Sequence, residues 1–170
     1  MQHRRIECTG QKGGDLTGRS RAGVGTKRHL VVDGNGIPLA IALSAGHRHE
    51  MTMAQQTVEA IRVPRRRGRP RTRPGGLAAD KGYDAGWFRR WLRGRGIRAS
   101  IPRLSNRKRR PGRPPSLSKA LSGNRWVVER TFAWLNSWRG IAVRYARRAY
   151  IYRGAIVLAA ITICLNALLK

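Results

Sequence analysis

The sequence predicts an α/β domain in which a mixed β-sheet is flanked by helices. Two apolar runs, residues 27–33 and 37–44, lie on either side of Gly34-Asn35-Gly36, which is a strong signal for a β-hairpin. A further short apolar run at 76–80 lies between two helical segments. A hairpin followed by alternating strands and helices is typical of layered α/β domains.

The other elements follow in chain order. Residues 1–26 are polar, basic and rich in Gly, so we expect an irregular basic arm, followed by the domain proper at 27–170. Residues 50–63 are expected to form a helix with Met53, Val58 and Ile61 in the core. The run at 76–80 is expected to be a buried strand that ends in a carboxylate, Asp80.

The second half alternates between helices and basic loops. Asp84 is expected to cap a helix that contains Trp87, Phe88, Trp91 and Leu92. A strand is predicted at 97–101 and helices at 124–138 and 150–169. The segments 64–75 and 102–123 combine Arg with Pro and Gly, which favours exposed basic loops.

The most apolar segment is residues 155–169, which include Thr162 and Asn166. A membrane-spanning helix needs roughly 20 apolar residues, so this segment is too short for one. We therefore expect a buried C-terminal helix.

The charge balance indicates a polyanionic partner. The chain has 36 Lys and Arg residues against 8 Asp and Glu residues, a formal net charge of +28. Nucleic acid is the expected partner, although a protein that binds any polyanion fits the same composition. Cys8 and Cys164 lie far apart without a Cys-x-x-Cys motif, which excludes a zinc ribbon or a thioredoxin-like site. With no signal peptide visible, we expect a cytoplasmic, nucleoid-associated protein.

In so basic a chain the carboxylates are the informative residues. Asp80 and Glu129 differ from the other six, which are Glu7, Asp15, Asp33, Glu50, Glu59 and Asp84. Asp80 ends a buried strand, and such positions face the crevice where α/β sheets bind ligands. Glu129 borders the helical apolar stripe of Val128, Phe132 and Leu135. Paired carboxylates that hold divalent metal ions are what phosphoryl transfer requires.

Structural roles explain the same residues. Asp80 can cap a turn, and Glu129 can pair with Arg125 one turn earlier. His47 and His49 fit an exposed loop better than a metal site. The segment 67–70, Arg-Gly-Arg-Pro, suits a narrow minor groove, but a phosphate-binding loop explains it better. Three tryptophans are expected in the core or at an interface: Trp126, Trp134 and Trp138.

Several motifs resemble one family in the same order along the chain. They are Gly18-Arg-Ser-Arg-Ala-Gly23, Thr26-Lys-Arg-His-Leu-Val-Val-Asp-Gly-Asn-Gly-Ile-Pro-Leu39, Gly46-His-Arg-His-Glu50, Leu77-Ala-Ala-Asp-Lys-Gly-Tyr-Asp84 and Arg125-Trp-Val-Val-Glu-Arg-Thr-Phe-Ala-Trp-Leu135. Together they are similar to the transposases of small bacterial insertion sequences, which carry an Asp-Asp-Glu triad on a ribonuclease-H-like fold. The resemblance runs from about residue 3 to residue 170.

The resemblance implies roles for individual residues. Asp80 would be the second acid of the triad and Glu129 the third, and both would hold Mg²⁺ or Mn²⁺ ions that activate water and then a DNA 3′-hydroxyl. Arg125 matches the family arginine four residues before the Glu. Ser122 and Asn136 depart from the pattern, because the family often has Tyr and a basic residue there. The expected DNA-binding residues are Arg65, Arg66, Arg67, Arg69, Arg71, Arg107, Lys108, Arg109, Arg110, Arg125 and Arg130.

The first acid of the triad has no counterpart, since Asp15 and Asp33 sit at other family positions. The resemblance therefore suggests a partial domain that lacks its central first strand, as a truncated remnant or as the second of two reading frames. We expect such a chain to be inactive and poorly folded alone, with an upstream polypeptide supplying the first Asp. Homo-oligomers, a non-catalytic DNA-binding fragment that inhibits the full enzyme, and a ribosome-associated protein remain alternatives.

Overall fold

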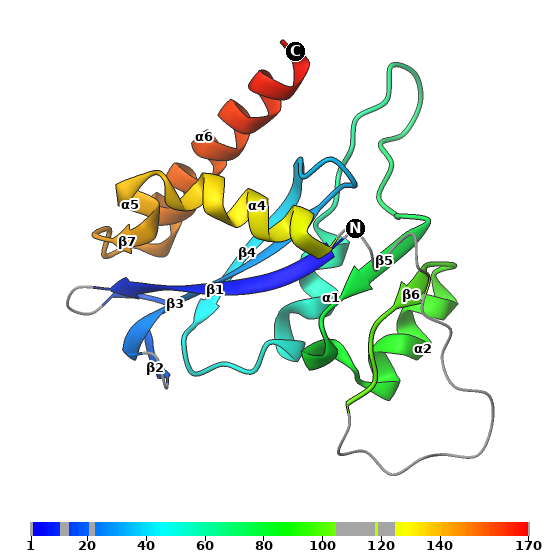
Figure 1. Cartoon of the computed structure of the whole chain (residues 1–170), viewed down its shortest axis with the longest axis horizontal. Helices are drawn as coiled ribbons and strands as arrows, with labels where there is room; N and C mark the ends of the chain where they lie inside the picture. The colour runs from blue at the N-terminus through cyan, green and yellow to red at the C-terminus, as the bar shows by residue number, and fades with distance from the viewer. Residues whose placement is uncertain (1, 11–13, 21–22, 105–117, 119–124, 170) are drawn as a thin grey trace.

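The computed structural model describes residues 2–10, 14–20, 23–104, 118 and 125–169, with residues 2–10 and 125 described as backbone only. A seven-stranded mixed sheet with helices on both faces forms the domain (Figure 1). The strands are β1 Gln2–Gly10, β2 Gly18–Ser20, β3 Gly23–Val32, β4 Pro38–Ala45, β5 Gly76–Ala79, β6 Arg98–Ser100 and β7 Val143–Arg144. The helices are α1 Met51–Glu59, the 3₁₀ turn η1 Lys81–Tyr83, α2 Gly86–Gly94, α4 Arg125–Asn136, α5 Arg139–Ala142 and α6 Ala149–Leu168.

Strand β1 is the centre of the sheet. It pairs antiparallel with β3 from Gln2 opposite Val32 to Thr9 opposite Gly25. On its other side, Gln2 and His3 pair parallel with Ala78 and Ala79 of β5, and β6 lies beyond β5. β4 completes the predicted hairpin with β3, while β2 pairs with the start of β3.

This position of β1 corrects two predictions. Residues 2–10, expected in an irregular arm, form a strand, and the arm also contains β2 and the start of β3. The central strand expected to be missing is present between the hairpin and β5. The reason is that backbone hydrogen bonds to strands distant in sequence determine this strand. Those bonds cannot be predicted from its own polar residues.

The hairpin turn follows from its residues. The Asp33 carboxylate Oδ1 accepts hydrogen bonds from the backbone N–H groups of Asn35 and Ile37, both at 2.9 Å. Gly36 adopts a φ of 89°, which is costly for residues with a Cβ. The turn chemistry therefore fixes the β3–β4 register, as predicted.

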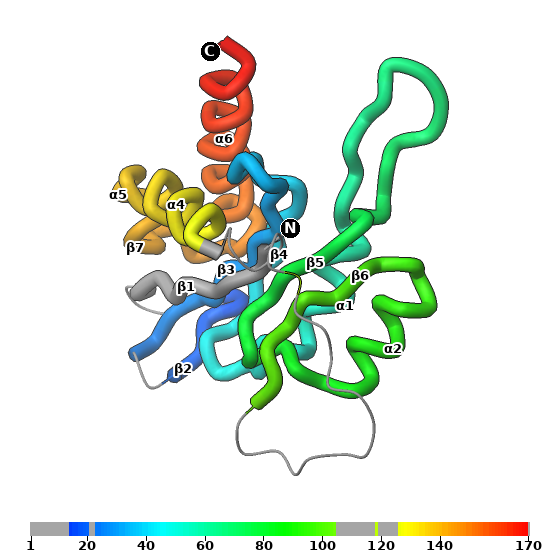
Figure 2. Tube along the Cα trace, turned by 45° about the vertical axis from the view of Figure 1, so that its right-hand side comes forward, coloured from blue at the N-terminus to red at the C-terminus, as the bar shows by residue number. Residues whose placement is uncertain are grey.

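Each face of the sheet carries its own core, because successive side chains of β3 point to opposite faces. Leu30 and Val32 pack with residues of α4, α5 and α6. Val31 packs with residues of α1, α2 and β5. Figure 2 shows α4 and α6 on one side of the strands and α1 with α2 on the other.

Most predicted elements are confirmed, with one exception at Asp84. The predicted helices and strands appear as α1, β5, α2, β6, α4 and α6, and the predicted core residues Met53, Val58 and Ile61 are buried. Asp84 does not cap α2, since Ala85 is the N-cap residue. Its buried carboxylate instead accepts from Arg89 Nε at 2.8 Å and from the N–H of Leu104 at 3.1 Å. These partners offset the cost of burying the carboxylate, which must be paired and hydrogen-bonded to be stable inside the domain.

Helix α6 differs from the buried helix that we expected. One face packs on the domain through Tyr152, Ile156 and Ala159, but only 28% of its most apolar 18-residue window is buried. By length and composition alone, α6 is also long and apolar enough to cross a membrane. An almost entirely apolar helix has no polar face, so its sequence could not show which side is buried.

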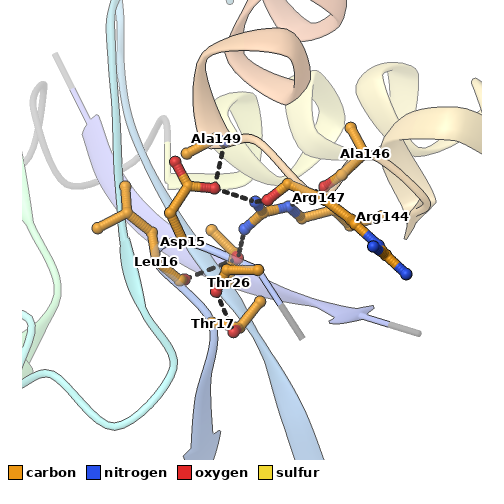
Figure 3. A network of polar contacts seen from close by, with 9 residues as sticks. Asp15, Leu16, Thr17, Thr26, Arg144, Ala146, Arg147 and Ala149 are labelled. Atoms are coloured by element: carbon orange, nitrogen blue, oxygen red, sulfur yellow. Dashed lines mark hydrogen bonds and ion pairs between the residues drawn. The ribbon is translucent and has the colours of Figure 1, made fainter. Parts of the chain in front are cut away.

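The start of α6 is anchored by a buried arginine (Figure 3). The Arg144 guanidinium donates to the backbone carbonyls of Ala146 and Arg147, both at 2.8 Å, and to the hydroxyl of Thr26 on β3. It also lies 3.4 Å from the Asp15 carboxylate. These bonds connect the loop before β2, the centre of the sheet and the segment that enters α6.

Candidate active site

Asp80 lies where β5 ends. Leu77, Ala78 and Ala79 are buried, and the chain then emerges so that Asp80 is half-buried. Its Oδ1 accepts a hydrogen bond from the N–H of Lys81 at 2.7 Å, which caps η1. The turn-capping role considered from the sequence is therefore confirmed. This cap also orients the carboxylate at the end of the strand.

Glu129 lies on α4, whose apolar stripe is confirmed. Val128, Phe132 and Leu135 are buried against the sheet, and Thr131 and Val127 extend the buried face. Glu129 stands beside this stripe with an exposed side chain. The helix therefore holds the backbone of Glu129 against the domain and leaves the carboxylate accessible.

Strand β1 is the shared neighbour of the two acids. α4 packs across β1, and β5 pairs with its first residues just before Asp80. Figure 1 shows the N-terminal turns of α4 beside the start of β1. Among the residues that the structure describes, no group of three or more His, Cys, Asp or Glu side chains is close enough to hold a metal ion.

Other polar residues contribute less to this region. His47 and His49 are exposed in the loop before α1, as expected, and His49 Nδ1 accepts from the N–H of Met51 at 3.3 Å. Glu50, not singled out from the sequence, reaches the turn after Asp80, because a Cβ added at Gly82 would lie 3.4 Å from Glu50 Oε2. No local pattern indicates this proximity, which arises from the contact between α1 and η1.

The hairpin turn braces α4 next to Glu129. Arg130 Nη2 donates to the carbonyl of Asn35 at 2.7 Å, and Thr131 Oγ1 donates to the carbonyl of Gly36 at 2.8 Å. A Cβ at Gly36 would lie 2.9 Å from Thr131 Oγ1, so the turn and the helix are in close contact. The rotational position of Glu129 therefore depends on the turn.

A second polar contact fixes the end of α4. The side chain of Arg28, buried in β3, donates from Nη2 to Asn136 Oδ1 at 2.8 Å, and its guanidinium lies 5.9 Å from the centre of the Phe132 ring. Asn136 is the position where the family often has a basic residue. In this chain that position is instead the acceptor for buried Arg28.

The three tryptophans expected in the core or at an interface are exposed. The Arg130 guanidinium lies between two of them, 4.5 Å from the Trp126 ring centre and 4.8 Å from that of Trp134. Cation–π contacts of this kind stabilise the exposed surface of a helix. A core position is therefore wrong for all three, since Trp126 and Trp134 lie on the side of α4 away from the sheet, and the interface role stays a prediction.

The predicted DNA-binding arginines fall into three groups. Arg65, Arg66, Arg67, Arg69 and Arg71 are all exposed on the loop between α1 and β5, which projects from the domain as an arm (Figures 1 and 2). Val63 and Arg71 close the arm through two backbone hydrogen bonds, at 2.9 and 2.8 Å. Arg130 is half-buried and bound to Asn35. Residues 107–110 and the Arg125 side chain lie outside the described part of the chain.

A cleft lies at the base of this arm. Its volume is about 630 Å³, and its lining includes Asp33 and Gly34 of the hairpin turn together with Arg71 and Arg73 of the arm. The arm therefore extends from the same end of the sheet as the turn that braces α4.

Comparisons with known proteins agree with these observations. A family model described as "Transposase DDE domain" matches residues 4–165. A curated protein of Burkholderia cepacia, named "Putative transposase for insertion sequence element IS402", is 41% identical over 149 residues, 87% of this chain. The match spans 66% of that relative's length, just under two thirds. No solved structure matches. Because the family match covers almost all of the described domain, the chain belongs to the family of transposase DDE domains.

Proposed function

We propose that this domain takes part in metal-dependent cleavage and transfer of DNA strands during transposition of an insertion sequence. The observation that supports the proposal is that Asp80 and Glu129 lie on two elements that both contact the central strand β1, because β5 pairs with it and α4 packs on it. The hairpin beside β1 and the parallel strands β5 and β6 are the arrangement that a ribonuclease-H-like domain would have. Family membership and the charge of +28 support the same function.

The chemistry of the two acids suits a hard divalent cation. Asp80 and Glu129 offer carboxylate oxygens, which Mg²⁺ and Mn²⁺ prefer over nitrogen or sulfur ligands. When bound, such ions activate the attacking oxygen and stabilise the leaving oxygen. The protein's part is to present both carboxylates from rigid elements, the end of β5 and helix α4.

We infer that a third carboxylate comes from polypeptide that would extend β1 backwards, in the same chain or in a separate one. Among the described residues, β1 pairs only with Ala78 and Ala79 of β5, although Gly76 and Leu77 also belong to that strand. Residues before Gln2 would continue this parallel ladder. In this register, residues before Gln2 would lie beside Leu77 and Gly76, so an Asp there would approach Asp80 along β5 from its N-terminal side.

DNA would be held mainly by the arm. Five exposed arginines on an extended loop can follow the phosphate backbone without reading the bases. A protein of this kind is expected to reside with the bacterial nucleoid. The arm and the two acids lie toward the same end of β1, so bound DNA can reach both.

Matched amide substitutions test the role of the two acids. In the chain joined to its upstream segment, Asp80→Asn and Glu129→Gln should each abolish Mg²⁺-dependent cleavage of element-end DNA while DNA affinity is retained. Glu59→Gln is the control, because Glu59 pairs with Arg95 on the surface at 3.1 Å. Cleavage by either active-site variant at the unmodified rate would remove that residue from the proposed site.

A non-catalytic role is the second candidate, favoured by one observation. The described residues contain no group of three acids, so this chain alone can bind DNA without cutting it. Such a fragment would inhibit a complete transposase by occupying the same element ends. Addition of the chain to a strand-transfer reaction of a complete relative would distinguish the two roles, since a catalytic partner raises the rate and a competitor lowers it.

A further inference from the structure

The outward side of α6 carries an apolar seam that the domain does not cover. Seven large apolar residues of this helix are exposed, and five of them form the seam: Ile151 (52%), Leu158 (65%), Ile161 (49%), Leu165 (52%) and Leu168 (80%). Figures 1 and 2 both show the C-terminal half of α6 extending away from the sheet. Exposed apolar rows of this length mark interaction sites in soluble proteins.

The spacing of the seam indicates what can cover it. With exposed Gly154 included, the five seam residues follow one another at alternating steps of three and four residues, from 151 to 168. This is the a/d pattern of a coiled coil, in which each side chain enters a hole formed by four residues of a partner helix. Residues that face the domain, such as Tyr152, Ile156 and Ala159, lie outside this seam. The seam therefore fits a second helix rather than a flat surface.

Two copies of this seam fit each other when their helices run in opposite directions. When two copies of α6 run antiparallel, Ile151 lies opposite Leu168, Gly154 opposite Leu165 and Leu158 opposite Ile161. Each pair is equally distant from the midpoint of the seam, so one two-fold axis produces all six layers. The small Gly154 faces the large Leu165, which lets the side chains interdigitate. Such self-complementarity is what an isologous dimer interface requires.

The lack of charge along most of α6 also favours a second copy of the chain as the partner. The chain is strongly basic, yet α6 has no charged residue between Arg153 and Lys170. This stretch therefore has no positive charge that would attract DNA phosphates. For the same reason, electrostatic repulsion between two copies, each with a charge of +28, is weakest at this part of the surface.

We propose that a second copy of this chain covers the α6 seam, with the two helices antiparallel about a two-fold axis near residues 159–160. The interface is independent of the catalytic proposal, because neither Asp80 nor Glu129 takes part in it. It joins two domains through their C-terminal helices and leaves both basic arms available.

Sedimentation equilibrium of the full chain in high salt, which screens the repulsion, tests the dimer. We expect a reversible dimer whose dissociation constant rises at least about tenfold in Leu158→Glu, since a charge then lies in the central layer. Trp87→Glu is the control, because Trp87 is an exposed apolar residue on α2 and should leave the constant unchanged. A monomer at all concentrations, or equal dissociation constants for the two variants, would overturn the proposal.

Disulfide cross-linking tests the direction of the helices. In a background with Cys8→Ser and Cys164→Ser, mixed Ile151→Cys and Leu168→Cys chains should cross-link, whereas Ile151→Cys alone should not. The reverse result would exclude the antiparallel pairing. Flotation with zwitterionic vesicles tests a membrane as the occupant, since a chain that floats with lipid as a monomer uses α6 as a membrane anchor and not as a dimer interface.

Discussion

Asp15 Oδ1 accepts a hydrogen bond from the backbone N–H of Ala149 at 2.7 Å, so a residue near the beginning of the chain satisfies the first turn of the last helix. The first N–H groups of a helix have no partner within it, and α6 has no cap from its own N-cap residue, Arg148. A carboxylate at this position also interacts favourably with the helix dipole. The loop at 14–17 therefore helps to decide where α6 begins.

Asp15→Ala is expected to lower the free energy of unfolding by about 1–2 kcal/mol, because a capping acceptor is lost. Asp15→Asn keeps an acceptor oxygen and should cost less. Urea unfolding followed by circular dichroism would measure both. Equal stabilities for Asp15→Ala and the unmodified chain would show that water replaces the cap at no cost.

Arg144→Lys should be more damaging than its conservative nature suggests. The guanidinium reaches four acceptors in different directions, and an ammonium at the end of a lysine cannot. We expect a loss of about 2–4 kcal/mol in unfolding free energy, since buried acceptors are left without a donor. Arg153→Lys on the exposed side of α6 is the matched control and should change stability by less than about 0.5 kcal/mol.

Replacement of Arg65, Arg66, Arg67 and Arg69 with Gln should flatten the salt dependence of DNA binding. Each phosphate contact contributes roughly 0.9 to the slope of log K against log salt. Fluorescence anisotropy at several salt concentrations would give the slope. The same four positions changed to Lys keep the charge and should keep the slope, and a slope unaffected by Gln would show that DNA does not contact the arm.

Cys164 should react slowly with alkylating reagents at neutral pH. Burial, and secondarily the negative charge of Asp33, raises the pKa of this thiol above its ordinary value. The folded state therefore favours the protonated thiol, and this contribution to stability is lost as the pH rises through the raised pKa. In a Cys8→Ser background, the pH midpoint of iodoacetamide reaction should lie higher for folded than for urea-unfolded protein; coincident midpoints would contradict this.

Deletion of residues 2–10 should abolish cooperative unfolding. β1 separates the hairpin from β5 and β6, so its loss divides the sheet and exposes two strand edges. Deletion of residues 65–69 is the control, because the arm is exposed and its closing hydrogen bonds lie outside that segment. Thermal melts by circular dichroism would compare the two. A sharp transition without β1 would show that β3 and β5 can be held together by the helices alone.

Elements determined by neighbouring residues could be predicted from the sequence. The β3–β4 hairpin follows from the Asp33–Gly36 turn, and the buried side of α4 follows from the spacing of Val128, Phe132 and Leu135. The position of Asp80 at the end of a strand could be predicted because the apolar run before it must be buried. In each case, the information lies within a few residues of the feature.

Features determined by distant partners could not be predicted. Strand β1 was missed because its ladder is formed with β3 and β5, which are far away in the chain. The bonds from Arg130 and Thr131 to Asn35 and Gly36 join positions 95 residues apart. The exposure of α6 was missed because a helix that is apolar all round gives no sign of which side the domain covers. Asp84 was misassigned because its partner Leu104 lies in a different segment.

The bonds between the hairpin turn and α4 make the turn a poor site for foreign sequence. Short surface turns with small residues are ordinarily the first places to accept a tag, a fused domain or a new chain terminus. Here the carbonyls of Asn35 and Gly36 set the angle of the helix that presents Glu129. A peptide inserted between them would leave the sheet intact and still rotate the acid.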